Sequence, residues 1–303
     1  MSRFDFLGAV SIDKICALDE RETLIDGFLL EKSINIVWGK SGLGKTWLCF
    51  AIAKYLSNLG VDSVYIDADN GIDLIKDRGY DEIIKELQGR ITYINADFMD
   101  DSKTQMQKTL ELIEEGAANG YEKALFILDS LSFFLGDGIY DEIKIYKLIT
   151  FCKKIRRAGG TVIIIAHATK GGTNLRGSSS LINSVDEVWE VGAQPSKAGE
   201  LNFVLSPYKQ RLDVKESAFN IELKGCKLNH AVPENIKIDE KEAALIEQIK
   251  SALLSGELNQ NKIYKALEKS KGDRGVQAVL DRFCGVYWDK FAGSGKNINY
   301  KLL

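Results

Sequence analysis

The segment from residue 39 to residue 46, GKSGLGKT, constrains the fold of this chain more than any other stretch of its sequence. The β-branched and aromatic run 34–38 before it predicts a buried strand, and apolar residues at helical spacing after it predict a helix that starts near Gly44. Glycines between a strand and a helix N-terminus let backbone N–H groups surround a phosphate chain. A chance glycine-rich turn would not need this spacing in this context. The segment therefore predicts a nucleoside triphosphate site.

The polar side chains of this loop have separate expected tasks. Lys45 should reach the β- and γ-phosphates, and the Thr46 hydroxyl should ligate Mg²⁺. Asp129 closes the apolar run 124–129, so it should emerge at the same sheet edge and hold Mg²⁺ through its water shell, although an acid there could merely cap the next turn. ATP and Mg²⁺ are the predicted cofactors. The predicted nucleotide contacts are Gly39, Lys40, Ser41, Gly42, Leu43, Gly44, Lys45, Thr46 and Trp47, and the predicted metal ligands are Thr46 and Asp129.

Composition places the chain among ordinary globular proteins of the cytoplasm. Its 303 residues are 45% hydrophobic and 27% charged, and the sequence has no apolar run of 18 residues or more. The first residues carry charges and lack the apolar core of a signal peptide. Five widely spaced cysteines and two histidines favour neither a disulfide framework nor a zinc site. We expect a cytoplasmic protein without a membrane partner.

The distribution of apolar residues predicts an α/β fold. Continuous apolar runs at 63–68, 91–96, 124–130 and 161–168 alternate with helical patterns at 74–87, 105–120 and 142–160, which is typical of a parallel sheet covered on both faces. After residue 185, strands follow one another through short turns and predict an antiparallel extension. We expect this first domain to occupy residues 1–230.

The C-terminal part of the chain has a different character. Residues 259–303 hold nine Lys or Arg against four Asp or Glu, a net charge of +5, so residues 1–258 carry −8 of the total −3. After a linker at 231–240, three amphipathic helices and a hairpin predict a winged helix-turn-helix at 241–303. A small bundle for subunit contacts is the alternative. The predicted DNA contacts in this domain are Lys271, Arg274 and Lys296.

Four further stretches resemble a known family. VYIDADNGIDL (64–74), ALFILDS (124–130), the long run 161–191 and SPYKQRLDV (206–214) are similar, in this order, to the motifs of RecA-like ATPases. The resemblance covers about residues 25 to 225. It is greatest to the ring-helicase branch, the DnaB-type replicative helicases and the small plasmid helicases of RepA type.

The resemblance implies roles for residues beyond the phosphate loop. Asp69 matches the acid that activates water, where the family usually has Glu, and Asp67 is the competing candidate for this role. His167 matches the residue that senses the γ-phosphate. The glycine- and serine-rich loop 168–184, expected to be mobile and solvated, would face the central channel of a ring, with Lys170 and Arg176 available to DNA phosphates.

A Lys-x-Arg pair near the end of the matched region has an implied role in a neighbouring subunit. Lys209 and Arg211 match the pair that ring helicases insert into the adjacent nucleotide site, where the arginine stabilises the charge of the transition state. A solvated strand edge is the alternative. If the pair acts in trans, hydrolysis requires assembly, and we expect a homo-oligomer, a hexamer in the ring helicases.

These observations together predict an ATP-dependent DNA helicase or translocase of the ring type, acting on single-stranded DNA in plasmid, phage or mobile-element replication. Its C-terminal domain would bind duplex DNA or a replication protein. The competing hypothesis is a RecA-like ATPase that serves as a DNA-binding regulator or recombination accessory factor without unwinding. A small-molecule kinase is a poor alternative, because the Ser/Gly-rich loop with its single Arg makes a poor lid.

Overall fold

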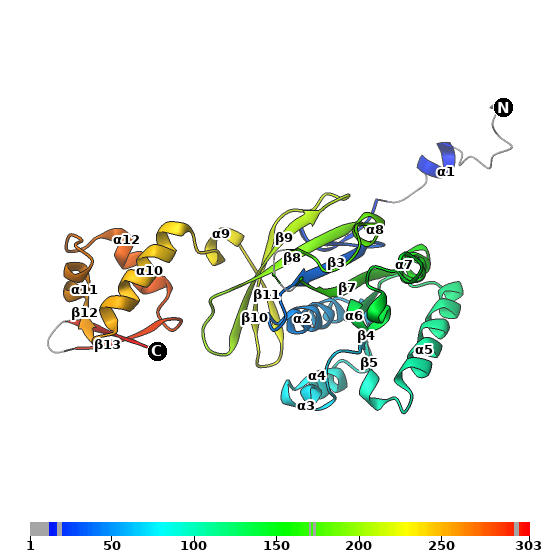
Figure 1. Cartoon of the computed structure of the whole chain (residues 1–303), viewed down its shortest axis with the longest axis horizontal. Helices are drawn as coiled ribbons and strands as arrows, with labels where there is room; N and C mark the ends of the chain where they lie inside the picture. Colours follow the sequence, from blue (N-terminus) through cyan, green and yellow to red (C-terminus); the bar gives the residue numbers. More distant parts are fainter. Residues whose placement is uncertain (1–11, 17–19, 170, 172–173, 294–296) are drawn as a thin grey trace.

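A nine-stranded mixed sheet forms the centre of the larger part of the molecule (Figure 1). The computed structural model describes residues 12–16, 20–169, 171, 174–293 and 297–303. The strand order across the sheet is β11-β10-β9-β8-β3-β7-β6-β4-β5. The strands are β3 (Ile34–Gly39), β4 (Asp62–Asp67), β5 (Ile91–Asn95), β6 (Ala124–Asp129), β7 (Thr161–His167), β8 (Glu187–Gln194), β9 (Glu200–Lys209), β10 (Ser217–Glu222) and β11 (Lys227–Ala231). A small hairpin, β1 (Thr23–Ile25) and β2 (Leu29–Leu30), precedes them.

The parallel half of the sheet has the strands that the apolar runs predict. β3 is buried along its whole length, and it lies between β7 and β8 with all three strands parallel. Strands that are buried on both faces have no side that faces solvent, so apolar and polar residues do not alternate along them. This is why these sequences are continuously apolar. The carboxyl ends of β3, β4, β6 and β7 therefore meet at one sheet edge, which positions the side chains that follow them.

The other half of the sheet requires one correction. All strands after residue 185 were expected to be antiparallel, but β8 pairs parallel to β3, with Asn35 opposite Glu187. Only β9, β10 and β11 run antiparallel to their neighbours. The helix α8 (Ser179–Ser184) reverses the chain between β7 and β8, so β8 enters the sheet in the direction of the earlier strands.

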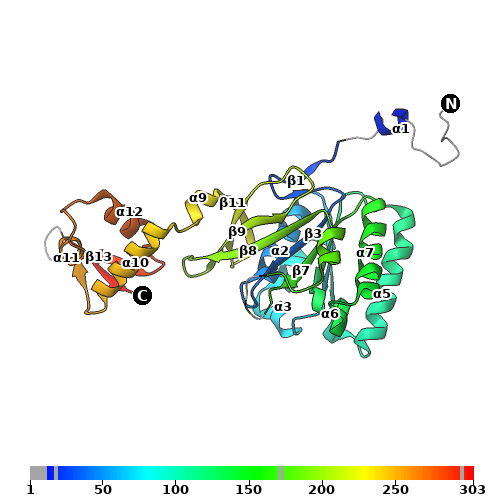
Figure 2. The same cartoon turned by 45° about the horizontal axis from the view of Figure 1, so that its top comes forward.

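Helices cover both faces of the sheet. The helix α2 (Lys45–Asn58) packs on one face, in a core cluster with Val37, Tyr65 and Ile163. The helix α7 (Glu142–Arg157) packs on the other face, in a cluster with Ile36, Ile66 and Ile164. Neighbouring strand residues alternate between these two cores, as the strand period of two requires. Figure 2 shows α5 (Ser102–Gly116) beside α7, on the side of the sheet away from α2. Shorter helices are α6 (Leu131–Leu135) and the 3₁₀ turns Ala96–Phe98, Ala117–Asn119 and Gly136–Gly138.

The predicted helix 74–87 is wrong in one respect, since two helices occupy it. They are α3 (Asp73–Asp77) and α4 (Tyr80–Glu86), and the chain turns between them at Gly79, whose φ is 66°. This left-handed conformation ends a helix, and glycine adopts it without the strain of a Cβ. The turn allows Tyr80 to stack on Phe50 of α2.

The C-terminal residues form a third core cluster, separate from the two that flank the large sheet. After α9 (Pro233–Ile236), which lies within the predicted linker, come α10 (Glu240–Leu253), α11 (Gln260–Ala266) and α12 (Arg274–Arg282). A three-stranded sheet in the order β12-β14-β13 completes this part: β12 (Leu258–Asn259), β13 (Trp288–Ala292) and β14 (Ile298–Leu302). Arg282 holds α12 to the preceding joint through the carbonyls of Asn235 and Lys237 and the carboxylate of Glu242.

At the other end of the chain, the short helix α1 (Ile12–Cys16) lies away from the sheet (Figure 1). Among the residues described, no helix has the length and apolar character to span a membrane.

Candidate functional site

The phosphate loop joins β3 to α2 as predicted. Gly44 has a φ of 89°, and a Cβ placed there would lie 3.2 Å from the Phe203 ring. A Cβ at Gly39 would lie 2.9 Å from the carbonyl oxygen of Val191 on β8. Both positions therefore require glycine, one for backbone conformation and close packing and the other for packing alone.

The side chain of Lys45 lies against the backbone of the phosphate loop. Its side chain is buried, and its ammonium group donates to the carbonyl oxygens of Gly39, at 3.0 Å, and Lys40, at 2.8 Å. Burial lowers its pKa, because the charged form loses hydration. A bound triphosphate would supply the anionic partner of the Lys45 ammonium group. The two carbonyl oxygens take the place of that partner only in part.

Asp129 lies beside the start of α2, at the end of β6. One of its carboxylate oxygens accepts hydrogen bonds from the Thr46 hydroxyl, at 2.8 Å, and from the Tyr65 hydroxyl, at 2.9 Å. Burial, together with the nearby charge of Asp67, raises the pKa of Asp129 to about 6. A hydroxyl and a carboxylate in contact beside a phosphate loop are hard oxygen ligands of the kind Mg²⁺ takes.

The residues present fit such an ion only in combination with a nucleotide. Within the described ranges, no cluster of three or more His, Cys, Asp or Glu side chains could hold a metal alone. Mg²⁺ in nucleotide sites keeps several waters and binds through one or two protein groups plus phosphate oxygens. Thr46 and Asp129 are the protein groups of that kind here.

The two acids at the end of β4, Asp67 within the strand and Asp69 just after it, have different surroundings. Asp67 is buried and accepts hydrogen bonds from the backbone N–H groups of Asp69 and Asn70, from the Asn70 amide and from the Tyr93 hydroxyl. Asp69 has 43% of its side chain exposed, and one carboxylate oxygen lies 3.1 Å from Nε2 of His167. The hydrogen bond with His167 lowers the pKa of Asp69. Asp67 is thus saturated by structural contacts, and Asp69 is the acid that faces the site.

His167 ends β7 and is joined through its backbone to the segment that follows. Its carbonyl accepts a hydrogen bond from the Arg176 N–H at 3.0 Å, and Thr169 donates to the Asn174 carbonyl at 2.8 Å. Arg176 is exposed, while the neighbouring Leu175 is buried. Lys170 lies outside the described residues.

The expectation of a solvated loop over the whole of 168–184 is wrong at its C-terminal end. Residues 179–184 form α8, capped by the Ser178 hydroxyl, which accepts from the N–H of Ser180 at 3.2 Å. Leu181 of this helix is fully buried. The serine N-cap and the buried leucine help to hold this short helix against the core on the α7 side of the sheet.

Lys209 and Arg211 hold the end of α8 in their own chain. The Lys209 ammonium donates to the carbonyls of Ile182 and Val185, at 2.6 and 2.7 Å, and the Arg211 guanidinium donates to the carbonyl of Asn183 at 2.5 Å. The buried Glu187 accepts from the backbone N–H groups of Arg211 and Leu212, which fixes the turn that presents the pair. Cations at a helix C-terminus satisfy its unpaired carbonyls and its dipole.

The hollow beside the phosphate loop has a volume of about 340 Å³ and extends beyond the phosphate-binding residues. Its lining also includes Trp47, Arg78, Leu201 and Leu223. Of these only Trp47 was predicted. Arg78 could not be found from the sequence, because its position depends on the break between α3 and α4. The Tyr65 hydroxyl on Asp129 was also missed, although a tyrosine in a buried apolar strand signals a need for a polar partner.

The first turns of the helix α7 carry two exposed cations, Lys144 and Lys147, near the segment that contains Arg176. Four more cations lie at the other end of the helix, where Lys154 pairs with Glu114 and Arg156 pairs with Asp186. Glu142 accepts a hydrogen bond from the Ser178 hydroxyl at 2.6 Å, which brings the two segments together. Tyr140 and Tyr146 are 62% and 71% exposed on or beside this helix. Exposed aromatic side chains among cations are typical of single-stranded nucleic-acid surfaces.

The predicted DNA contacts of the C-terminal part lie on its surface where they are described. Lys271 and Arg274 are exposed at the start of α12, and Lys296 lies outside the described residues. Lys262, Lys265 and Lys269 are exposed on and after α11. Over the stretch that the structure describes, none of the five described cations forms an ion pair; these are Lys262, Lys265, Lys269, Lys271 and Arg274.

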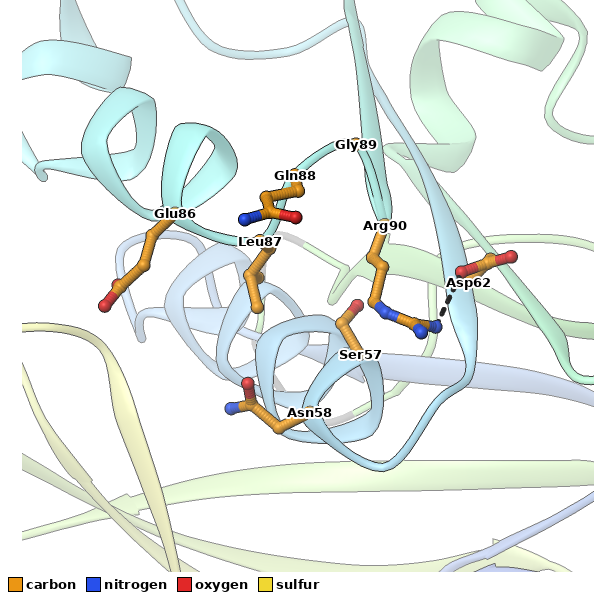
Figure 3. Close-up of a pocket in the computed structure, with 8 residues that line it drawn as sticks. All are labelled: Ser57, Asn58, Asp62, Glu86, Leu87, Gln88, Gly89 and Arg90. Carbon is orange, nitrogen blue, oxygen red and sulfur yellow. Dashed lines mark hydrogen bonds and ion pairs between the residues drawn. The ribbon is translucent and has the colours of Figure 1, made fainter.

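A second hollow, of about 620 Å³, lies at the opposite sheet edge (Figure 3). It is formed where α2 ends and where β4 and β5 begin, and an ion pair between Arg90 and Asp62, at 3.2 Å, crosses it. It is shallow and polar, and it contains none of the residues that follow the carboxyl ends of the parallel strands.

Comparison with known proteins relates these features to two groups of sequences. Residues 2–173 match the protein family described as AAA domain. The DNA repair and recombination protein RadB of Methanococcus maripaludis is 28% identical over 138 residues, 44% of this chain and 53% of RadB. A protein of the same name from the strain S2 matches to the same extent. The chain spans about half the length of the curated relatives it matches.

Proposed function

We propose that this chain, which belongs to the AAA domain family, is a DNA-stimulated ATPase. The observation that carries the proposal is the meeting of two residue pairs, Thr46 with Asp129 and Asp69 with His167, at the phosphate-loop edge of the sheet. The first pair suits a metal-bound triphosphate. The second pair connects the hydrolytic side of the site to the segment that carries Arg176.

In this proposal the phosphate loop and Lys45 bind and orient the triphosphate, and Thr46 and Asp129 hold Mg²⁺, which neutralises charge on the phosphates. Asp69 positions the attacking water and accepts its proton, because its carboxylate is accessible while that of Asp67 is fully engaged. His167 holds Asp69 through Nε2 and would detect a γ-phosphate by exchanging this contact.

Three observations support nucleic acid as the partner. The backbone of His167 is bonded to Arg176, the first turns of α7 carry the exposed Lys144 and Lys147, and two exposed tyrosines, Tyr140 and Tyr146, lie on or beside these turns. The name of the RadB relatives refers to DNA repair and recombination. We propose single-stranded DNA on this surface, bound through phosphate contacts by Arg176 and Lys147 and through stacking by Tyr140 and Tyr146.

The C-terminal part is proposed to be a winged helix-turn-helix at 241–303, joined by the linker 231–240 to the ATPase domain at 1–230. Three helices and a small antiparallel sheet agree with this assignment, and the five unpaired cations on α11, on the turn and at the start of α12 give it a surface for a duplex backbone.

Two biological roles follow from the same chemistry. The motif order favours a ring-type helicase or translocase, with Lys209 and Arg211 reaching the site of the next subunit of a hexamer. The RadB relatives favour a recombination accessory ATPase in which nucleotide switches DNA binding without unwinding. The proposed DNA-stimulated hydrolysis is common to both, and assembly distinguishes them.

The test is the ATPase rate as a function of protein concentration, with and without single-stranded DNA. DNA stimulation with a rate that rises more steeply than protein concentration would support a shared-site ring, and strand displacement would then be measured. A slow, linear rate with DNA stimulation would support the accessory role. A rate that DNA does not change, or that persists in Lys45→Ala, would contradict the proposed function.

A further inference from the structure

We propose that Tyr65 is a positioning residue for the nucleotide site, because its hydroxyl fixes the carboxylate of Asp129 in the orientation that holds Mg²⁺ beside the phosphate loop. Tyr65 would act through Asp129, without touching metal or nucleotide itself. This inference rests on the proposed ATPase function and adds the residue that sets how strongly Mg²⁺ supports nucleotide binding.

Tyr65 lies within β4 and reaches the neighbouring strand β6. In the parallel pairing of these strands Tyr65 is opposite Ile127, which lies two residues before Asp129. Residues two apart on a strand share a face of the sheet, so the Tyr65 ring lies on the face that also carries the Asp129 carboxylate. The Tyr65 hydroxyl donates to Oδ2 of Asp129 at 2.9 Å.

The surrounding core holds the Tyr65 ring in place. The residue is 0% exposed, and its ring stacks on that of Tyr93, with centroids 5.3 Å apart and 15° between the ring planes. The Phe50 ring of α2 lies on it at 5.9 Å. A close-packed ring cannot move without disturbing its neighbours, so its hydroxyl is a donor in a fixed position.

Asp129 connects this core to the nucleotide hollow. Asp129 lines the hollow, and the oxygen that accepts from Tyr65 also accepts from the Thr46 hydroxyl at 2.8 Å. The two donors together fix the orientation of the carboxylate, one from the loop side and one from the core. Groups that hydrogen-bond to a metal ligand orient that ligand, and their removal typically weakens metal binding by about 10- to 100-fold.

The stacked neighbour Tyr93 offers a matched control. Its hydroxyl donates to Asp67, and both Asp67 and Asp129 are 1% exposed. Substitution of either tyrosine by phenylalanine therefore removes one hydroxyl from one buried carboxylate. Only Asp129 is a proposed metal ligand, so the two variants separate the loss of a buried hydrogen bond from the loss of metal positioning.

The test is the affinity of the full chain for a non-hydrolysable ATP analogue, measured by equilibrium dialysis in Mg²⁺ and in chelator. The ratio of the two dissociation constants reports the coupling between metal and nucleotide. Tyr65→Phe should lower this ratio by about tenfold and change the affinity in chelator little, because the phosphate loop is intact. Tyr93→Phe should keep the ratio of the unaltered chain, and urea unfolding should show that both variants fold.

A double substitution shows whether Tyr65 acts through Asp129. Asp129→Asn should lower the ratio by itself, and addition of Tyr65→Phe should lower it no further, since residues that act through one contact are not additive. An unchanged ratio in Tyr65→Phe, an equal fall in Tyr93→Phe, or a further fall in the double variant would overturn the inference while leaving nucleotide binding intact. A ratio of one in the unaltered chain would overturn the proposed metal role and this inference with it. Absence of binding in both conditions would overturn the proposed nucleotide site itself.

Discussion

The environment of Asp129 disfavours its negative charge. It is 1% exposed, and its pKa is raised from 3.8 to about 6 by burial and by Asp67. In the absence of metal the folded chain therefore holds the Asp129 proton more tightly than the unfolded chain does. The consequence is a free-energy cost of folding above pH 6, which protonation relieves as the pH falls from 6 towards 4.

Asp129→Asn should remove this cost while keeping an oxygen that can accept from Thr46 and Tyr65. With chelator present, the variant should be more stable than the unaltered chain at pH 7.5 by up to about 3 kcal/mol, and the difference should disappear near pH 4. Urea unfolding at both pH values measures this. A variant that is equally or less stable at pH 7.5 would contradict the account, and ATP hydrolysis should be lost in either case.

The two acids after β4 should separate catalysis from stability. Asp69→Asn should lower the ATPase kcat by about 10² to 10⁴ with little change in unfolding, because it removes only the exposed proton acceptor. Asp67→Ala should lower stability by about 2 to 4 kcal/mol, because it leaves the Tyr93 hydroxyl and the Asn70 donors without their acceptor. Activity and urea denaturation are measured on both. Equal kcat losses with unchanged stability would show that the assignment is wrong.

Sequence reasoning at this scale located Lys45, Thr46, Asp129 and His167 at one edge, because each follows or ends a predicted strand or loop. It could not choose between Asp67 and Asp69. That choice depends on Tyr93 of the neighbouring strand, whose hydroxyl occupies Asp67.

At the scale of elements, the segment after β7 and the helix α7 act as one surface. Their contact runs from Ser178 to Glu142, and Arg176 and Lys147 are the exposed cations on either side. Each phosphate neutralised on a single strand makes the slope of the logarithm of the association constant against the logarithm of the salt concentration more negative by about 0.7.

Arg176→Gln combined with Lys147→Gln should therefore make the salt dependence of single-strand binding shallower by about 1.4. Fluorescence anisotropy of a labelled oligonucleotide at several salt concentrations measures the slope. Lys108→Gln, an exposed lysine on the adjacent α5, is the control and should change the slope little. A slope that is the same in the double variant and in the unaltered chain would remove this surface from the binding site.

The strands were easier to predict than the breaks between helices. Long apolar runs identify buried strands whatever lies around them, whereas the turn between α3 and α4 depends on one glycine and on the docking of Tyr80 against α2. The helix α8 is a second example. Its serine-rich sequence suggests a loop, but the stretch is helical and buries Leu181. Tertiary contacts, absent from a local pattern, decide such cases.

At the scale of the whole molecule, two sets of cations are expected to bind different forms of DNA. Lys271→Gln with Arg274→Gln should weaken binding to duplex DNA several-fold and leave single-strand binding and ATP hydrolysis unchanged, since α12 belongs to a separate core. Competition between labelled duplex and single strands measures this. Equal losses for both forms would indicate one continuous surface instead of two.

The strand order of the large sheet, with β8 beside β3, is what the linear sequence did not show, because pairing partners there are about 150 residues apart.

The contact of Lys209 and Arg211 with the end of α8 has a thermodynamic consequence. In the proposed ring, the same cations could not satisfy these carbonyls and a neighbour's triphosphate at once, so the two arrangements would compete. If a bound DNA strand loosened α8, it would raise the affinity of the pair for the neighbour's nucleotide, and by reciprocity that nucleotide would raise the affinity for the strand by the same factor. In each protomer, binding of one of the two ligands would in this way raise the affinity for the other.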